Sequence, residues 1–177
     1  MKLATGFALL TIAIASTYSI SANAVETDHA NGANPTARCQ GALPAFETQI
    51  RKRPLAVQNE GTANSFITCS FEYDVVNAIG NSGVLLDTYF SNNTAAAVNL
   101  NCTAVTGFQG EESVNEYVAQ TIEIPANGHA NPVWIDTDFE NGFASGLISI
   151  SCNIPPGVGI NDTYIFWVED DLVDEPV

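Results

Sequence analysis

Apolar and polar residues alternate along several short segments of the chain. In "AAVNLNC", Val98, Leu100 and Cys102 share one face of an extended strand, and asparagines occupy the other face. In "GLISISC", Ile150 and Cys152 share a face in the same way. No window of about a dozen residues keeps a convincing period of 3.6, so the pattern predicts strands and no long helix.

Turn-forming residues separate these segments at intervals of about ten residues. They occur in "NEGTAN", "NAIGNSG", "SNNTA", "PANGHANP" and "PPGVGIND". About eight or nine short strands at this spacing are typical of an all-β protein. We therefore expect one antiparallel β-sandwich, Ig-like or jelly-roll-like. The chain has no internal repeat, which argues against a propeller or a solenoid.

The N-terminal segment has the features of a secretory signal peptide. Lys2 supplies the positive charge, "LATGFALLTIAIA" is an apolar run too short to span a bilayer, and "ANA" predicts cleavage after Ala24. No later run is long and apolar enough to cross a membrane, so we expect no membrane insertion. The predicted organisation is a signal peptide at 1–24, a flexible leader at 25–37, the β-sandwich domain at 38–170 and an acidic tail at 171–177.

Charge narrows the classes of partner. The chain carries 5 Lys and Arg residues against 20 Asp and Glu residues. Without Lys2, the only charged residue of the signal segment, 4 cations face 20 carboxylates and the net charge is −16. Such a surface repels nucleic acid and anionic lipid, so we exclude nucleic acid as a partner.

All four cysteines lie in the part of the chain that follows the predicted signal peptide. An even number of cysteines in an exported protein predicts two disulfides, for which three connectivities exist. We favour Cys39–Cys69 with Cys102–Cys152, because each pair then joins segments that neighbour one another in a meander. The spacing does not match a paired C-x-x-C zinc site.

Four segments together are similar to a known group of proteins. They are "NSFITCSFEYD", "VNLNCTAV", "QTIEIPANGHANPVWI" and "ISISCNIPPGVGINDTYIFWVED". They resemble a recurrent family of small exported proteobacterial proteins with an N-x-C strand and an S-C-x-[IL]-P-P-G-x-G-I motif near the C-terminus. The likeness covers about residues 38 to 170 and implies a β-sandwich with two disulfides, periplasmic or secreted, from a Gram-negative bacterium. It implies no activity and no catalytic residue.

Residues for nucleophilic catalysis are sparse. The two histidines are His29, in the expected leader, and His129, in the turn "ANGHANP". The chain has no G-x-S-x-G motif to present a serine beside a histidine and a carboxylate. We therefore predict no catalytic residues, no enzyme activity and no cofactor.

Calcium is the metal that the sequence favours. "DTDFENG" places Asp136, Asp138 and Glu140 at alternate positions, and alternating oxygen ligands in a tight loop suit a hard cation. The segment departs from an EF-hand loop, because its sixth position is Asn141 and its twelfth is Leu147. The alternative is an exposed acidic loop without metal.

Three of the five cations are adjacent in the sequence. In "IRKRPL", Arg51, Lys52 and Arg53 precede Pro54, a residue confined to edge strands or bulges. Clustered cations and a proline protect a strand from edge-to-edge pairing, which is the simpler interpretation. In the second interpretation, this basic edge contacts the acidic segment 168–177 of another copy and gives self-association.

Aromatic residues give a further hypothesis, a stacking surface for a cell-surface glycan. The candidates are Trp134, Trp167, Tyr73, Tyr89, Tyr117 and Tyr164, with Trp134 as the leading interaction residue. The alternative is that these rings belong to the core.

The leading functional hypothesis is an exported, non-catalytic structural or binding module that assembles through its basic edge and acidic C-terminus. The alternative hypothesis is a carbohydrate-binding or calcium-stabilised adhesion-type domain. A hydrolase is the third and least favoured hypothesis, because the sequence lacks the motifs that hydrolases need.

Overall fold

The computed structural model describes residues 25–73, 84–107, 115–143 and 146–171. The predicted signal peptide and all of the acidic tail except Asp171 lie outside the described residues. No helix within the described ranges is long and apolar enough to span a membrane.

Two antiparallel β-sheets form the fold, so the predicted β-sandwich is confirmed, with twelve strands in the described residues instead of eight or nine. Sheet A has the order β10 (Val133–Ile135), β6 (Leu85–Asn92), β12 (Val158–Asp171), β4 (Ala56–Asn59), β3 (Ile50–Arg53), with β1 (Val25–Ala33) on β12 and β9 (His129–Ala130) on β6. Sheet B has the order β2 (Cys39–Gly41), β5 (Ser65–Glu72), β11 (Leu147–Ile154), β7 (Val98–Thr106), β8 (Glu116–Ile124). Three short helices connect strands: α1 (Pro35–Arg38), α2 (Pro44–Glu47) and the 3-10 helix η1 (Asp136–Asp138).

The core lies between the two sheets and is built by the alternation seen in the sequence. In β5, every second residue is buried and the residues between them face solvent. In β11, Ile148, Ile150, Cys152 and Ile154 are buried in the same way. One apolar cluster joins side chains from both sheets, which is why a chain of this size folds around a single core.

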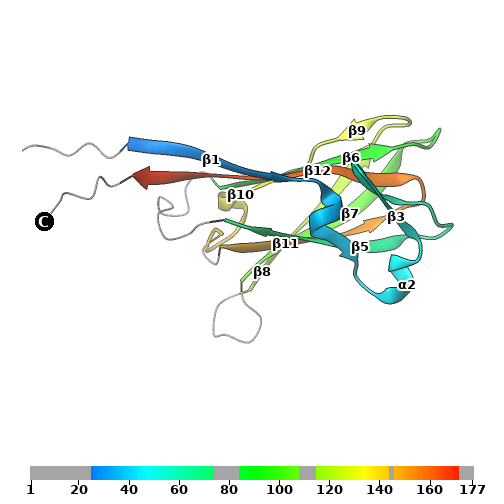
Figure 1. Ribbon diagram of the computed structural model, residues 1–177, viewed down its shortest axis with the longest axis horizontal. Helices are drawn as coiled ribbons and strands as arrows, with labels where there is room; N and C mark the ends of the chain where they lie inside the picture. The colour runs from blue at the N-terminus through cyan, green and yellow to red at the C-terminus, as the bar shows by residue number, and fades with distance from the viewer. Residues whose placement is uncertain (1–24, 74–83, 108–114, 144–145, 172–177) are drawn as a thin grey trace, which may run out of the picture.

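Strand β1 corrects the prediction of a flexible leader at 25–37. Its nine residues pair antiparallel with the second half of β12, from Val25 opposite Asp171 to Ala33 opposite Thr163. Backbone pairing with β12 holds β1 in place, and its side chains bury little apolar surface. A polar sequence without apolar alternation can therefore form this strand. Figure 1 shows β1 and β12 side by side, projecting beyond the rest of the sandwich.

Both disulfides join directly opposite residues on neighbouring strands of sheet B. Cys39–Cys69 links β2 to β5, and Cys102–Cys152 links β7 to β11. This is the connectivity that we favoured from the sequence. Disulfides persist in oxidising compartments, so the two bonds indicate an exported protein.

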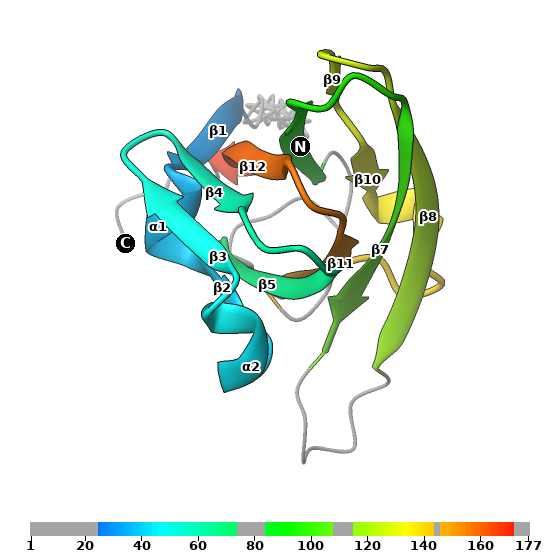
Figure 2. The ribbon, with the colours of Figure 1, turned by 90° about the vertical axis from the view of Figure 1, so that its right-hand side faces the viewer.

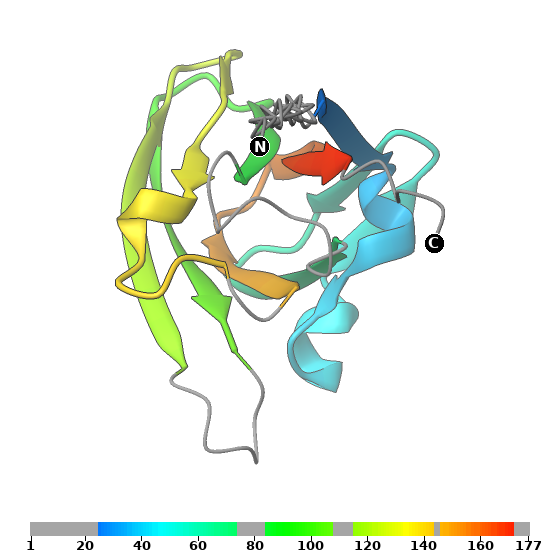
Figure 3. The ribbon, with the colours of Figure 1, turned by 90° about the vertical axis from the view of Figure 1, so that its left-hand side faces the viewer.

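The two sheets approach each other along β8. On β8, Gln120 donates a hydrogen bond from Nε2 to the Val133 carbonyl of β10 at 2.9 Å, and β8 lies beside the β9–β10 segment in Figure 2. Strands β1 and β12 lie together on the far side of the sandwich from β8 when it is viewed from the other end (Figure 3). The outer face of sheet A around β12 is therefore not covered by β8.

Candidate functional site

An aromatic pair stands on the outer face of sheet A. Tyr164 and Phe166 are two residues apart on β12, so they share the face that points away from the buried Ile165. Their ring centroids are 5.9 Å apart and their planes differ by 22°. Phe166 is 37% exposed and Tyr89, nearby on β6, is 40% exposed. Aromatic rings on a rigid sheet form a ready surface for a ligand.

An apolar row crosses the sheet at the level of Phe166. Strand pairing places Ile135 of β10 opposite Leu85 of β6, Leu85 opposite Phe166, and Phe166 opposite Ala30 of β1. Directly opposite residues in antiparallel strands share one face, with Cβ atoms about 4.5–5.5 Å apart. We call Leu85, Tyr89, Ile135, Tyr164 and Phe166 the aromatic platform.

The ring of Tyr164 lies over Gly32 of β1. A Cβ atom at residue 32 would lie 2.5 Å from Cε1 and 2.7 Å from Cδ1 of Tyr164. Distances of this size are far inside van der Waals contact, so only glycine at this position lets the ring occupy its place. Residue 32 therefore sets where the Tyr164 ring lies.

A carboxylate and an amide lie next to the rings. Asp87 is directly opposite Tyr164, on β6. The hydrogen-bond network orients the Asn131 amide, so that its nitrogen donates to the Thr88 carbonyl at 2.9 Å and to Oδ1 of Asp87. The amide oxygen then accepts from the Tyr89 hydroxyl at 3.3 Å. Asn131 thus connects the carboxylate to the platform.

The environment of Asp87 changes its protonation. Burial raises the pKa of the Asp87 carboxyl above its ordinary value of 3.8, and the hydrogen bond from Asn131 opposes this shift. A carboxyl whose pKa is raised in the folded state is destabilising when it is ionised. The ionised side chain therefore opposes folding instead of supporting it.

Replacing Asp87 with Asn should leave the protein equally or more stable at pH 7, because the amide keeps the shape without the buried charge. The destabilisation by Asp87 is fully present above its raised folded pKa and vanishes as pH falls below the ordinary value of 3.8. The difference in melting temperature between Asp87→Asn and wild type should therefore shrink in acid. A variant that is less stable than wild type at pH 7 would show that the carboxylate supports the fold.

The prediction that Trp134 is the leading interaction residue is wrong. Its side chain is 0% exposed, because it lies opposite Leu86 on the inner face of sheet A. A buried ring cannot stack against a ligand, so Trp134 belongs to the core. Tyr73 is also buried, and burial raises the pKa of its hydroxyl to about 12.

The other aromatic candidates divide among three surfaces. Tyr89 and Tyr164 lie together on the platform. Tyr117, at 68% exposure, lies on β8 of sheet B. Trp167 points to the face of β12 opposite Phe166, where it stacks on His29 with centroids 5.4 Å apart.

The acidic loop does not gather its carboxylates. Within the described ranges, no group of three or more His, Cys, Asp and Glu side chains is placed to hold a metal ion. Asp138 instead accepts from the Ile135 amide at 2.9 Å, and Asp136 from the Thr137 amide at 2.9 Å. The backbone amide of Glu140 is bound by Glu116 of β8. The structure therefore does not assemble Asp136, Asp138 and Glu140 into the predicted calcium site.

The basic cluster forms β3, which is an edge strand of sheet A. Each of its cations has a partner within the chain. Arg51 Nη1 lies 3.4 Å from Glu60, Arg53 also pairs with Glu60, and Lys52 Nζ lies 3.0 Å from Glu47. Exposed pairs of this kind contribute little to stability. This arrangement fits a protected edge, and self-association through it stays a prediction.

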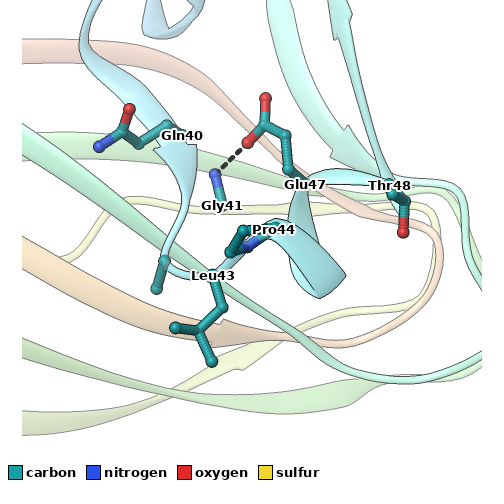
Figure 4. Close-up of a pocket in the computed structure, with 7 residues that line it drawn as sticks. Gln40, Gly41, Leu43, Pro44, Glu47 and Thr48 are labelled. Atoms are coloured by element: carbon teal, nitrogen blue, oxygen red, sulfur yellow. Dashed lines mark hydrogen bonds between the residues drawn. The ribbon is translucent and has the colours of Figure 1, made fainter.

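A concave surface lies beside α2. It is a cavity of about 440 Å³ lined by Gln40, Gly41, Ala42, Leu43, Pro44, Glu47 and Thr48 (Figure 4). Its one carboxylate, Glu47, accepts from the Gly41 amide and pairs with Lys52. The Gly41 hydrogen bond, followed by Lys52, lowers the pKa of Glu47. The carboxylate is thus occupied structurally, and this cavity offers less chemistry than the platform.

Sequence reasoning missed Phe166, Asp87, Asn131 and Gly32. Phe166 had a usable signal, because "TYIF" places it two residues after Tyr164. No such signal marked Asp87, Asn131 and Gly32, because their roles depend on which strands become neighbours.

Comparison with known proteins gives distant likenesses only. No protein-family model matches the chain, and no curated protein matches it. Similar solved structures include a Clostridium thermocellum endo-1,4-β-D-xylanase containing CBM22-1 and GH10 modules, at 11% identity, 69% of this chain, 23% of that chain and a TM-score of 0.41. A family 11 carbohydrate-binding module from Clostridium thermocellum matches at 10% identity, with 85% of this chain, 91% of that chain and a TM-score of 0.38.

A Bacillus endospore appendage protein from disulfide-linked pili matches at 9% identity, with 88% of this chain, 98% of that chain and a TM-score of 0.35. Of the xylanase structure, by contrast, this chain spans less than a quarter. Likenesses with TM-scores below 0.5 carry no inference of function, so function must be derived from this chain's own surface.

Proposed function

We propose that this protein is an exported, non-catalytic binding module that holds a glycan on the outer face of sheet A. The observation that carries the proposal is the stacked pair of the half-buried Tyr164 and the exposed Phe166, beside the carboxylate of Asp87. A sugar is amphipathic, with apolar C–H groups on the ring face and hydroxyl groups around its edge. The rings of the platform can contact the C–H groups, and the neighbouring Asp87 carboxylate can accept hydrogen bonds from the hydroxyl groups.

The platform also suits a polymer in its shape and stiffness. It lies on an open sheet face formed by β10, β6, β12 and β1, along which an extended ligand can run. Each ring is held by cross-strand neighbours, and Tyr164 is additionally positioned over Gly32. Binding therefore needs little ordering of side chains, which lowers its entropic cost.

Replacing Tyr164 with Ala should weaken glycan binding on the order of tenfold, which corresponds to about 1.4 kcal/mol. Affinity electrophoresis measures it, with native gels that contain hydroxyethylcellulose, xylan, mixed-linked β-glucan, β-galactan or galactomannan. The wild-type protein should be retarded by at least one of these glycans. The Tyr164→Ala variant should need about tenfold more of that glycan for the same retardation.

Tyr117→Ala is the matched control, because Tyr117 is an exposed tyrosine on the other sheet. It should be retarded as the wild type is. Thermal unfolding of each variant checks that the fold is intact. If none of the glycans retards the wild type, or if Tyr117→Ala loses retardation as Tyr164→Ala does, the proposal is wrong.

A further inference from the structure

The strands that carry the platform place carboxylates on its face. Asp28 of β1, Asp87 of β6 and Asp162 of β12 point to the same side as Tyr164, as the strand register requires. No Lys or Arg lies on β1, β6, β9, β10 or β12 within the described ranges. Arg51 and Arg53 of β3 lie on the same face of sheet A, two strands away from β12, and both are paired with Glu60. Lys52 lies on the other face of β3, and Arg38 lies at the end of α1.

The Arg38 side chain is also committed to other contacts. Its Nη2 donates to Oδ1 of Asn31 at 2.6 Å, and its guanidinium lies 5.3 Å from the centroid of the Phe71 ring. Arg38 therefore has partners that it would have to leave before it could bind a ligand on the platform. An anionic ligand on the platform would meet three carboxylates, in a chain with a formal net charge of −15. The cations of this face, Arg51 and Arg53, lie two strands from β12 and are already paired with Glu60.

The carboxylate of Asp87 has one oxygen available for a ligand. Asn131 donates to Oδ1, and no donor within the described ranges reaches Oδ2 in this arrangement. A partly buried carboxylate is stabilised by a hydrogen-bond donor and destabilised by a second negative charge. A sugar hydroxyl supplies such a donor without bringing a charge.

The apolar row argues against a small cation as the ligand. Aromatic rings near carboxylates also suit ammonium groups. Here, however, the apolar side chains extend from Ile135 through Leu85 to Phe166 and on to Ala30 of β1. At about 4.8 Å between strands, this row is about 14 Å long. A ligand that covers it needs an extended apolar surface, which the ring faces of an uncharged polysaccharide supply.

We infer that the ligand of the platform is a neutral polysaccharide, that one of its hydroxyl groups donates to Oδ2 of Asp87, and that polyanionic glycans are rejected. This inference rests on the proposed function and adds the chemical class of the ligand. The rejection comes from Asp28, Asp87 and Asp162, and the recognition from the Asp87 carboxylate and the rings.

Each glycan that retards the wild-type protein is tested in native, carboxymethylated and quaternary-ammonium form, with hydroxyethylcellulose and carboxymethylcellulose as the first pair. At low ionic strength the carboxymethylated form should bind about tenfold more weakly or worse, because several charges come close to the aspartates. The difference should narrow in 0.5 M salt, where the Debye length falls to about 4 Å. The quaternised form should bind no more tightly than the neutral form at 0.5 M salt.

Asp87→Asn provides the residue-level readout. This variant should bind the neutral glycan several-fold more weakly and should show a smaller difference between the neutral and carboxymethylated forms. Equal or tighter binding of the carboxymethylated glycan, tighter binding of the quaternised one at high salt, or an unchanged difference in Asp87→Asn overturns the inference and leaves glycan binding in place. Absence of binding to every glycan overturns the proposed function itself.

Discussion

Replacing Cys102 and Cys152 together with Ala should lower the free energy of unfolding by about 4 kcal/mol. The two residues are 50 positions apart in the sequence, so their bond restricts a long loop of the unfolded chain. They also lie opposite each other on β7 and β11, central strands of sheet B, and both are 0% exposed. Guanidinium denaturation, followed by tryptophan fluorescence, measures the loss.

The pair Cys39 and Cys69 is the matched control for that prediction. Its loop is shorter, at 30 positions, which gives about 0.5 kcal/mol less stabilisation by the same entropy relation. It also ties β2, a three-residue edge strand, so opening it should disturb less of the sheet. An equal or greater loss for the Cys39/Cys69 variant would contradict this ranking.

Replacing Gly32 with Ala should destabilise the protein by about 1–3 kcal/mol and abolish glycan retardation. The added methyl group would lie 2.5 Å from Cε1 of Tyr164, so either the ring or β1 has to move. Displacing the ring separates it from Phe166 and disrupts the platform, although Gly32 itself bears no side chain that a ligand could contact. Chemical denaturation and the same affinity gels measure the two effects.

A double-mutant cycle isolates the steric cause of this effect. In a Tyr164→Ala background the clash is removed, so Gly32→Ala should cost little further stability. An equal loss in both backgrounds would mean that residue 32 acts through the backbone of β1 and not through the ring.

The sandwich could be predicted because, in a strand, the alternation of apolar and polar residues shows which side chains are buried. The alternation in "GLISISC" and "AAVNLNC" marks the inner faces of β11 and β7. The disulfide connectivity followed from the neighbourhood of these segments. Strand β1 escaped prediction because "VETDHANGA" has no apolar face, and only its pairing with β12 makes it a strand.

The candidate site was harder to predict than the fold. Tyr89 and Tyr164 were two of the six aromatic candidates for stacking. The sequence did not show which of the six face solvent. Trp134 was the leading candidate, whereas its position opposite Leu86 buries it. Asp87 and Asn131 are 44 residues apart, and only the tertiary fold brings them together. Such placements depend on register between distant strands, which a single sequence does not reveal.

The pairing of β1 with β12 has a consequence for when the proposed binding face is complete. The Thr163 hydroxyl donates to the Ala33 carbonyl across 130 residues of chain, and Gly32 and Tyr164 are the next pair along the same two strands. Contacts of such long sequence separation form late, because most of the chain must be ordered first. The proposed glycan face needs residues from both strands, so a chain in which β12 has not yet folded lacks it. Under the proposed function, glycan binding therefore begins only after β12 has paired with β1.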